Sequence, residues 1–206
     1  MYKVFFNHKT VFITGSKELQ HSGSSFTFIY NYSKSELYKM IIELISDRIN
    51  VDIIYVVTTD VEKTWEDFCS NFKLVKAAGG IVKNKEGEYL FIKRRGKWDL
   101  PKGKCEKNEE IEKCAQREIG EECGISGLIL KKKIIDTFHT YQLKNRLILK
   151  KTSWYEYDYS GNEQPVPQTE EDITDIEWMR TENLKTITEN TFPSIIEVMK
   201  RSNLSV

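Results

Sequence analysis

The stretch from Gly103 to Ile125, which reads G-K-C-E-K-N-E-E-I-E-K-C-A-Q-R-E-I-G-E-E-C-G-I, decides the fold of this chain. Asn108 is a good helix N-cap, acidic residues follow it where the helix dipole favours negative charge, and Gly124 supplies a C-terminal stop. The stretch therefore predicts a helix from about residue 109 to residue 123. An apolar stripe at helical spacing would hold this helix against a core, and its members are Ile111, Ala115 and Ile119.

Three carboxylates share one face of the predicted helix. Glu118, Glu121 and Glu122 are spaced i, i+3 and i+4, so their side chains project in the same direction. Oxygen ligands of this kind suit hard divalent cations such as Mg²⁺ or Mn²⁺. Taken alone, the three residues fit a solvated acidic helix face better, because charge runs are commonplace. The complete motif reverses that preference.

The complete stretch resembles the Nudix box, the signature of the Nudix hydrolases. The residues that carry the resemblance are Gly103, Glu109, Arg117, Glu118, Ile119, Glu121, Glu122, Gly124 and Ile125. The resemblance implies that the three carboxylates bind the metal and that Arg117 and Glu109 fix the loop and orient them. Gly103 would allow the turn that brings the loop over the metal site. The implied reaction is metal-assisted attack of water on a phosphoanhydride bond.

The second part of the chain, residues 76–206, contains the box and is expected to form the Nudix hydrolase domain. The resemblance implies an α/β fold in which a mixed β-sheet is sandwiched between helices. The sequence predicts strands at 76–83, 89–93, 128–138, 147–157 and 175–179, a loop at 161–169 and a closing helix at 192–201.

The first part, residues 1–75, falls outside the resemblance and is expected to form a small α+β unit of unknown role. The sequence predicts strands at 2–6, 11–14, 26–30 and 51–57, a helix that runs to about residue 47 after an N-cap at Ser33, and a helix at 61–72. This unit would support a homodimer, cover the substrate or simply stabilise the catalytic domain.

Basic residues near the loop before the helix are candidates for binding a polyphosphate. The segment F-I-K-R-R-G-K-W-D-L-P-K-G-K, residues 91–104, supplies Arg94, Arg95, Lys102 and Lys104. Next to an acidic metal cluster, a basic rim suits phosphates that metals bridge. The alternative is a solvated hairpin end, which is about as common for any one of these residues.

His139 and Tyr141, in the sequence F-H-T-Y, are further candidates for substrate binding. The tyrosine ring would stack on a base, and the histidine would donate to a phosphate or transfer a proton. In the dinucleoside polyphosphate branch of the family, a tyrosine lies shortly beyond the box. The loop W-D-L-P-K-G also resembles the one that precedes the box in diadenosine polyphosphate and diphosphoinositol polyphosphate hydrolases. Ordinary strand-end packing is the alternative for both side chains.

A later acidic loop offers a further carboxylate near the metal. Nudix enzymes commonly place a glutamate from such a loop at the metals, as an extra ligand or general base. The run T-E-E-D supplies Glu170, Glu171 and Asp172, of which Glu171 is the preferred candidate. For each residue alone, a solvated acidic loop is the more common situation.

The resemblance implies a Mg²⁺-dependent hydrolase, with Mn²⁺ as a possible substitute, acting on a dinucleoside polyphosphate such as diadenosine tetraphosphate. The alternatives are hydrolysis of ADP-ribose, of an oxidised nucleotide or of diphosphoinositol polyphosphate, and a nucleotide-sensing regulatory protein without turnover. The proline that marks many ADP-ribose hydrolases beyond the box is absent, which weighs against that substrate. Sensors often lose the metal-binding glutamates, and this chain keeps them.

Composition indicates a cytoplasmic protein, and the resemblance implies a nucleotide-type small molecule as its substrate. The 206 residues include 31 basic and 31 acidic ones, so no charged tail points to a nucleic acid or a membrane surface. We expect neither a membrane span nor a signal peptide. The four cysteines show no C-x-x-C pair and do not resemble a disulfide framework or a zinc site, and Cys114 and Cys123 fit small buried thiols. A reducing compartment is therefore expected.

Overall fold

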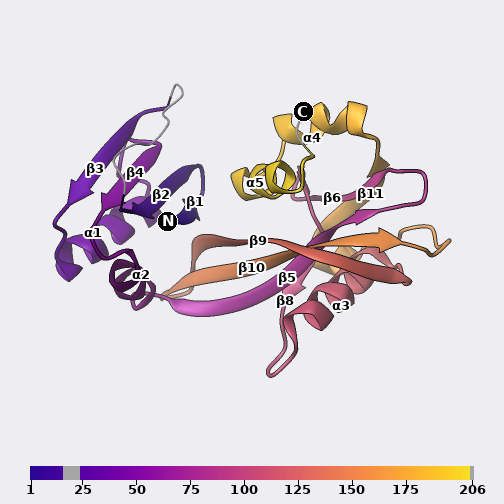
Figure 1. Ribbon diagram of the computed structural model, residues 1–206, viewed down its shortest axis with the longest axis horizontal. Helices are drawn as coiled ribbons and strands as arrows, with labels where there is room; N and C mark the ends of the chain where they lie inside the picture. Colours follow the sequence, from indigo (N-terminus) through magenta and orange to yellow (C-terminus); the bar gives the residue numbers. More distant parts are fainter. Residues whose placement is uncertain (16–23, 205–206) are drawn as a thin grey trace. The chain divides into compact units, whose positions relative to one another are not determined.

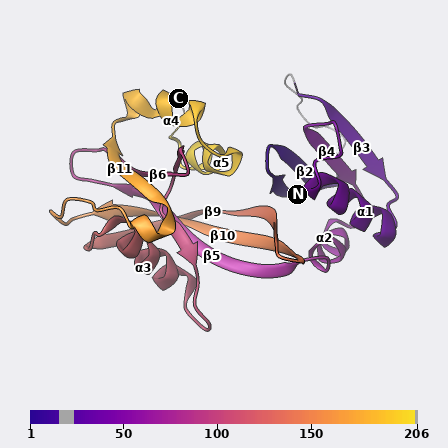
Figure 2. The same cartoon turned by 180° about the vertical axis from the view of Figure 1, so that it is seen from behind.

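The computed structural model describes residues 1–15 and 24–204 of the chain. The chain forms two compact units (Figure 1, Figure 2). The first unit contains residues 1–75 and 138–150, and the second contains residues 76–137 and 151–206. No helix within the described ranges is long and apolar enough to cross a bilayer.

A β-sheet forms the centre of the second unit. Its strands follow the order β11-β6-β5-β10-β9, while β7 pairs with β6 and β8 pairs with β5. The strands are β5 (Lys73–Lys83), β6 (Tyr89–Arg94), β7 (Lys97–Asp99), β8 (Lys102–Lys104), β9 (Leu128–Leu143), β10 (Arg146–Tyr159) and β11 (Ile173–Met179). The predicted first hairpin is confirmed, because β5 and β6 are antiparallel with Lys83 opposite Tyr89. The strands predicted at 128–138 and 147–157 are also confirmed, and both are longer than expected.

Helices cover both faces of this sheet, as the resemblance implies (Figure 1). The helices are α3 (Ile111–Cys123), α4 (Leu184–Glu189) and α5 (Pro193–Arg201), and the 3₁₀ turns are η1 (Thr169–Glu171) and η2 (Thr181–Asn183). Leu90 and Ile92 of β6 pack in the same core as α3, whereas Phe91 packs in the core of α4 and α5. Successive side chains of a strand point to opposite faces, so one strand contributes to two cores. The sequence predicted α5 but not α4.

The helix that carries the motif starts later than predicted. α3 begins at Ile111 with Glu110 as its N-cap, and no side chain caps it there. The predicted cap at Asn108 is wrong, because Asn108 has a φ of 66° and lies in the left-handed region that asparagine tolerates. The predicted stop is confirmed, since Gly124 has a φ of 65°. The apolar stripe is confirmed too, because its members are fully or partly buried in one core with the sheet.

The first unit packs two helices against a sheet that mixes parallel and antiparallel pairs. Its elements are β1 (Tyr2–Phe6), β2 (Lys9–Thr14), β3 (Phe26–Tyr30), α1 (Lys34–Ile45), β4 (Ile53–Val57) and α2 (Val61–Cys69), which agree closely with the prediction. The strand order is β9-β1-β2-β4-β3; β1 and β2 are antiparallel, and the other three pairs are parallel. Ser33 caps α1 as predicted and forms a reciprocal capping box with Glu36.

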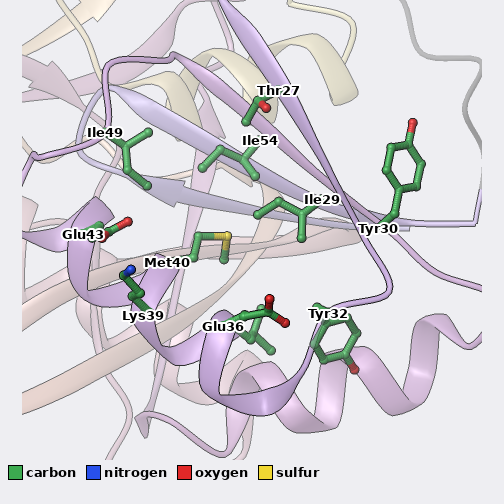
Figure 3. A pocket seen from close by; sticks show the side chains of 11 residues that line it. Thr27, Ile29, Tyr30, Tyr32, Glu36, Lys39, Met40, Glu43, Ile49 and Ile54 are labelled. Carbon is green, nitrogen blue, oxygen red and sulfur yellow. The ribbon is translucent and has the colours of Figure 1, made fainter.

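A hollow of about 320 Å³ opens between β3 and α1 of the first unit (Figure 3). Ile29, Met40 and Ile54 give it an apolar lining, and Lys39 and Glu43 of α1 stand beside them. None of the residues predicted to bind metal or substrate lines this hollow among the described parts of the chain.

Candidate active site

One arginine on α3 gathers three carboxylates of the motif. The Nε and Nη2 atoms of Arg117 donate to the two carboxylate oxygens of Glu109, at 2.8 and 2.9 Å. Its Nη1 atom donates to Glu118 at 2.7 Å and to Glu121 at 2.9 Å. The fifth contact of the guanidinium is the backbone oxygen of Lys104, at 3.2 Å. Arg117 therefore ties the loop before α3 to two of the three proposed metal ligands.

Glu109 is a fixed support in this network. Hydrogen bonds from Arg117 lower the pKa of Glu109 to about 2, and its second hydrogen-bond partner is the backbone N–H of Glu106 at 2.8 Å. The same pair raises the pKa of the Arg117 guanidinium above its usual value. Both groups stay charged near neutral pH, so neither is suited to transferring a proton.

Gly103 provides space for Glu118. It lies within strand β8 rather than in a turn, in register with Ala78 of β5. A Cβ atom at this position would overlap the Oε2 atom and the carboxyl carbon of Glu118. Burial raises the pKa of Glu118, and the hydrogen bond from Arg117 opposes that change. The motif glycine thus lets a partly buried carboxylate approach the backbone closely.

Glu122 sits deeper than the other two proposed ligands and outside the Arg117 network. Only 2% of the residue is exposed, and it accepts a hydrogen bond from the backbone N–H of Lys102 at 2.8 Å. Burial raises the pKa of Glu122 to about 7, although the charges of Lys102 and Arg94 and the backbone hydrogen bond act to lower it. A carboxylate with so little solvent around it is well suited to a cation as its partner.

Lys102 was predicted to bind substrate, but its side chain is bonded to the protein. The Nζ atom donates to Asp99 at 2.6 Å and to the backbone oxygen of Leu100 at 3.3 Å. The two charged side chains are 11% and 5% exposed. Asp99 was not among the predicted site residues, and its position three residues before Lys102 in the loop is the signal that could have pointed to it.

We expect Lys102→Met to destabilise the protein by about 3 kcal/mol, because removing one member of a buried ion pair leaves the other charge unpaired. Urea denaturation would measure the change in the free energy of unfolding. The double variant Lys102→Met, Asp99→Asn should recover most of the loss, since the asparagine oxygen still accepts from the Leu100 N–H. An unchanged stability with a higher KM would instead place the ammonium group on the substrate.

The basic rim and the late acidic loop meet in ion pairs. Arg94 donates to Glu171 at 3.0 Å, and Arg95 donates through two nitrogens to Asp172 at 3.0 and 2.9 Å. The positive charge of Arg94 also lowers the pKa of Glu122, so Arg94 lies close enough to that carboxylate to affect its charge. The side chain of Lys104 is exposed. The role of Glu171 at a metal stays a prediction.

His139 and Tyr141 belong to the first unit. Their rings stack with centroids 5.6 Å apart at an interplanar angle of 30°, and His139 is in register with Phe5 of β1. Their contact with a substrate stays a prediction.

The expectation that the cysteines form no disulfide is wrong for one pair. Cys105 and Cys114 are bonded, while Cys69 and Cys123 are free. Sequence spacing gave no sign of the pair, because a turn of irregular backbone brings the two residues together. The ligand atoms of Cys105, Glu109 and Cys114 lie within 4.8 Å of one another. In the described part of the chain no other group of three such residues is so close, so the three proposed metal ligands are more widely spaced.

Comparison with known proteins gives a family match and one curated relative. The profile of the NUDIX domain matches residues 73–198. An mRNA-decapping enzyme subunit 2 of Arabidopsis thaliana is 30% identical over 142 residues, which are 65% of this chain and 35% of that protein. The chain thus spans about a third of the length of this relative.

Many solved structures are similar to this chain, and two of them illustrate the likeness. A MutT protein from Methanosarcina mazei Go1 is 19% identical with a TM-score of 0.49, covering 65% of this chain and 94% of that one. A C. elegans Ap4A hydrolase is 19% identical with a TM-score of 0.46, covering 63% of this chain and 95% of that one.

Proposed function

The chain belongs to the NUDIX domain family. From this premise we propose that it is a pyrophosphohydrolase that cleaves a phosphoanhydride bond in a dinucleoside polyphosphate, such as diadenosine tetraphosphate, with Mg²⁺ as its metal. The observation that carries the proposal is the single guanidinium of Arg117 that holds Glu109, Glu118 and Glu121 beside the loop. This arrangement orients the proposed acidic metal ligands in advance, beside the basic rim of the site.

The donor set fits a hard divalent cation. Glu118, Glu121 and Glu122 would hold it through oxygen atoms only, which favours Mg²⁺ or Mn²⁺ over softer metals. Burial raises the pKa of both Glu118 and Glu122, so a nearby cation would stabilise their charged forms. Long glutamate side chains reach a common point by rotation about their χ angles. When bound, the cation supplies an activated water and neutralises phosphate charge.

The protein's own residues would bind and orient the polyphosphate. Arg94 and Arg95 are each paired with one exposed carboxylate of the late loop, and such pairs exchange easily for phosphate oxygens. Lys104 adds an exposed cation directly after Gly103. A substrate with several phosphates would contact more of these separate cationic side chains than a substrate with one phosphate.

The curated relative adds a second candidate with the same bond chemistry. Its name states that it acts in mRNA decapping, and a cap joins a nucleoside to the 5′ end of an RNA through phosphoanhydride bonds. The 30% identity favours testing a capped RNA oligonucleotide beside the free dinucleoside polyphosphates. ADP-ribose, oxidised nucleotides and diphosphoinositol polyphosphate complete the set of substrates that the motif allows.

The purified protein should convert diadenosine tetraphosphate to ATP and AMP in the presence of Mg²⁺. EDTA should abolish turnover, and added Mg²⁺ or Mn²⁺ should restore it, because the three glutamates alone cannot activate water. Chromatography of the products from the whole panel identifies both the substrate and the bond cleaved. Turnover of another compound would keep the chemistry and replace the substrate. Tight metal-dependent binding without turnover of any compound would contradict the proposal and indicate a sensor.

A further inference from the structure

The disulfide between Cys105 and Cys114 lies inside the motif. Cys105 directly follows strand β8, Cys114 lies in the first turns of α3, and their Cα atoms are 5.3 Å apart across a sequence separation of nine residues. This Cα separation is one that a disulfide accommodates without backbone movement. The bond therefore joins the loop before the helix to the helix that carries the proposed metal ligands.

The segment that the bond encloses contains Glu109. Its carboxylate receives two hydrogen bonds from Arg117, which in turn contacts Glu118 and Glu121. The backbone N–H of Cys105 donates to the backbone oxygen of Lys76 in β5 at 3.1 Å, so one end of the segment is fixed on the sheet. Cys114, at the other end, is part of α3, so the disulfide links the sheet end of the segment directly to the helix. Opening it removes this cross-link across the segment that holds Glu109.

The four cysteines differ in their access to solvent. Cys105 is partly exposed, whereas Cys114 is fully buried. Burial raises the pKa of Cys69 to about 11 and raises that of Cys123 as well, so these two thiols are poor nucleophiles at neutral pH. Cys105 is thus the accessible member of the bonded pair, whereas Cys69 is a partly exposed free thiol outside it and Cys123 is a buried one.

We infer that Cys105 and Cys114 form a reversible thiol–disulfide modification site, whose oxidation positions Glu109 and Arg117 and thereby strengthens metal binding by the glutamates of α3. The inference rests on the proposed function for its effect on turnover. The formation of the bond and its effect on metal affinity are measurable without turnover.

The reaction needs a small-molecule disulfide such as oxidised glutathione. The Cys105 thiolate attacks one sulfur of that molecule, breaks its S–S bond and releases one thiol. The Cys114 thiolate then displaces the second thiol and forms the protein disulfide. Two electrons pass to the small molecule, which leaves as two thiols, and the protein gives up the two thiol protons. An excess of thiol reverses both steps.

The test compares the wild-type protein after oxidised glutathione and after a phosphine reductant, each removed before measurement. Alkylation of free thiols followed by mass spectrometry of peptides reports the state of each cysteine. Calorimetric titration with Mn²⁺ reports metal affinity, and the Mg²⁺ concentration for half-maximal turnover of diadenosine tetraphosphate reports the same quantity in the reaction. Loss of an orienting partner weakens metal binding by about 10- to 100-fold in other sites, so loosening one should give about three- to tenfold here.

Two variants separate this role from general stability. Cys105→Ala should bind Mn²⁺ as weakly as the reduced protein, should not respond to oxidant, and should keep kcat near wild type at saturating metal. Cys69→Ala should respond to oxidant as the wild type does. If no compound of the panel is turned over, the Mn²⁺ titration still decides the inference, and only the proposed function fails.

Equal Mn²⁺ affinity in the oxidised and reduced wild-type protein would overturn the inference. So would fully alkylated Cys105 and Cys114 after treatment with oxidised glutathione. Stoichiometric Zn²⁺ in the reduced protein, lost in Cys105→Ala, would overturn it as well, because the pair would then be a soft-metal site completed by Glu109.

Discussion

Replacing Glu121 by glutamine lowers turnover by about 10³-fold, a barrier increase of about 4 kcal/mol, and leaves the fold intact. The side chain of Glu121 is 50% exposed, so the neutral amide does not bury an unsatisfied group. Arg117 keeps Glu109 and Glu118 as partners, so the loop stays in place. What the variant loses is one of the three proposed negative oxygen ligands. Steady-state kinetics across a range of Mg²⁺ concentrations would measure the effect, and circular dichroism would check the fold.

Glu112→Gln is the matched control for this experiment. Glu112 is an exposed residue in the first turn of the same helix, so the change in charge is identical and the network of Arg117 is untouched. Its turnover should equal that of the wild type. Full activity of Glu121→Gln at every metal concentration would remove Glu121 from the metal site.

Gly103→Ala is expected to lower turnover by at least about 10²-fold with little loss of stability. The added Cβ atom overlaps the Glu118 carboxylate, so that carboxylate must move away from β8. The displaced atoms are the end of a flexible side chain rather than backbone, so the sheet accommodates the change. A proposed ligand then points away from the position that Arg117 gives it. Metal titration and thermal denaturation, measured on one preparation, would separate the two effects.

Gly15→Ala provides the comparison, because a Cβ atom at Gly15 meets its neighbours at 3.6 Å or more, which is ordinary contact. This variant should match the wild type in turnover and metal affinity. If Gly103→Ala were as active as Gly15→Ala, close approach to Glu118 would not be the reason for a glycine at this position. Loss of folding in Gly103→Ala alone would give the residue a structural role instead.

Regular periodicity in the sequence was sufficient to predict most of the fold. Strands and helices whose apolar residues alternate or repeat at helical spacing lie where they were predicted, in both units. The short helix α4 was missed because its six residues offer only Leu184 and Ile187 as a buried pair. The start of α3 was misplaced because asparagine suits both a helix cap and a left-handed turn, and the sequence does not distinguish them. The positive φ of Asn108 shows that it occupies a left-handed turn and does not cap the helix.

The candidate site was predictable only where a motif fixed the partners. The contacts of Arg117 with Glu118 and Glu121 lie among residues that the motif singles out, whereas the bond between Lys102 and Asp99 was not foreseen. Lysine at the rim of a site suits phosphate and carboxylate equally, so charge alone does not select the partner. The disulfide pair likewise depends on how a turn places two Cα atoms, which local pattern does not reveal.

The hairpin of β9 and β10 has a consequence for the order in which the chain folds during its synthesis. The first unit needs residues 138–150, whose Phe138, Leu147 and Leu149 pack in its core, and β1 pairs with β9. N-terminal domains ordinarily fold as they leave the ribosome. Here the first unit cannot complete its core until the motif helix and the tip of the hairpin have both emerged. The ribosome therefore releases the catalytic motif before the N-terminal unit is finished, and cutting the chain at residue 75 divides one core between two fragments.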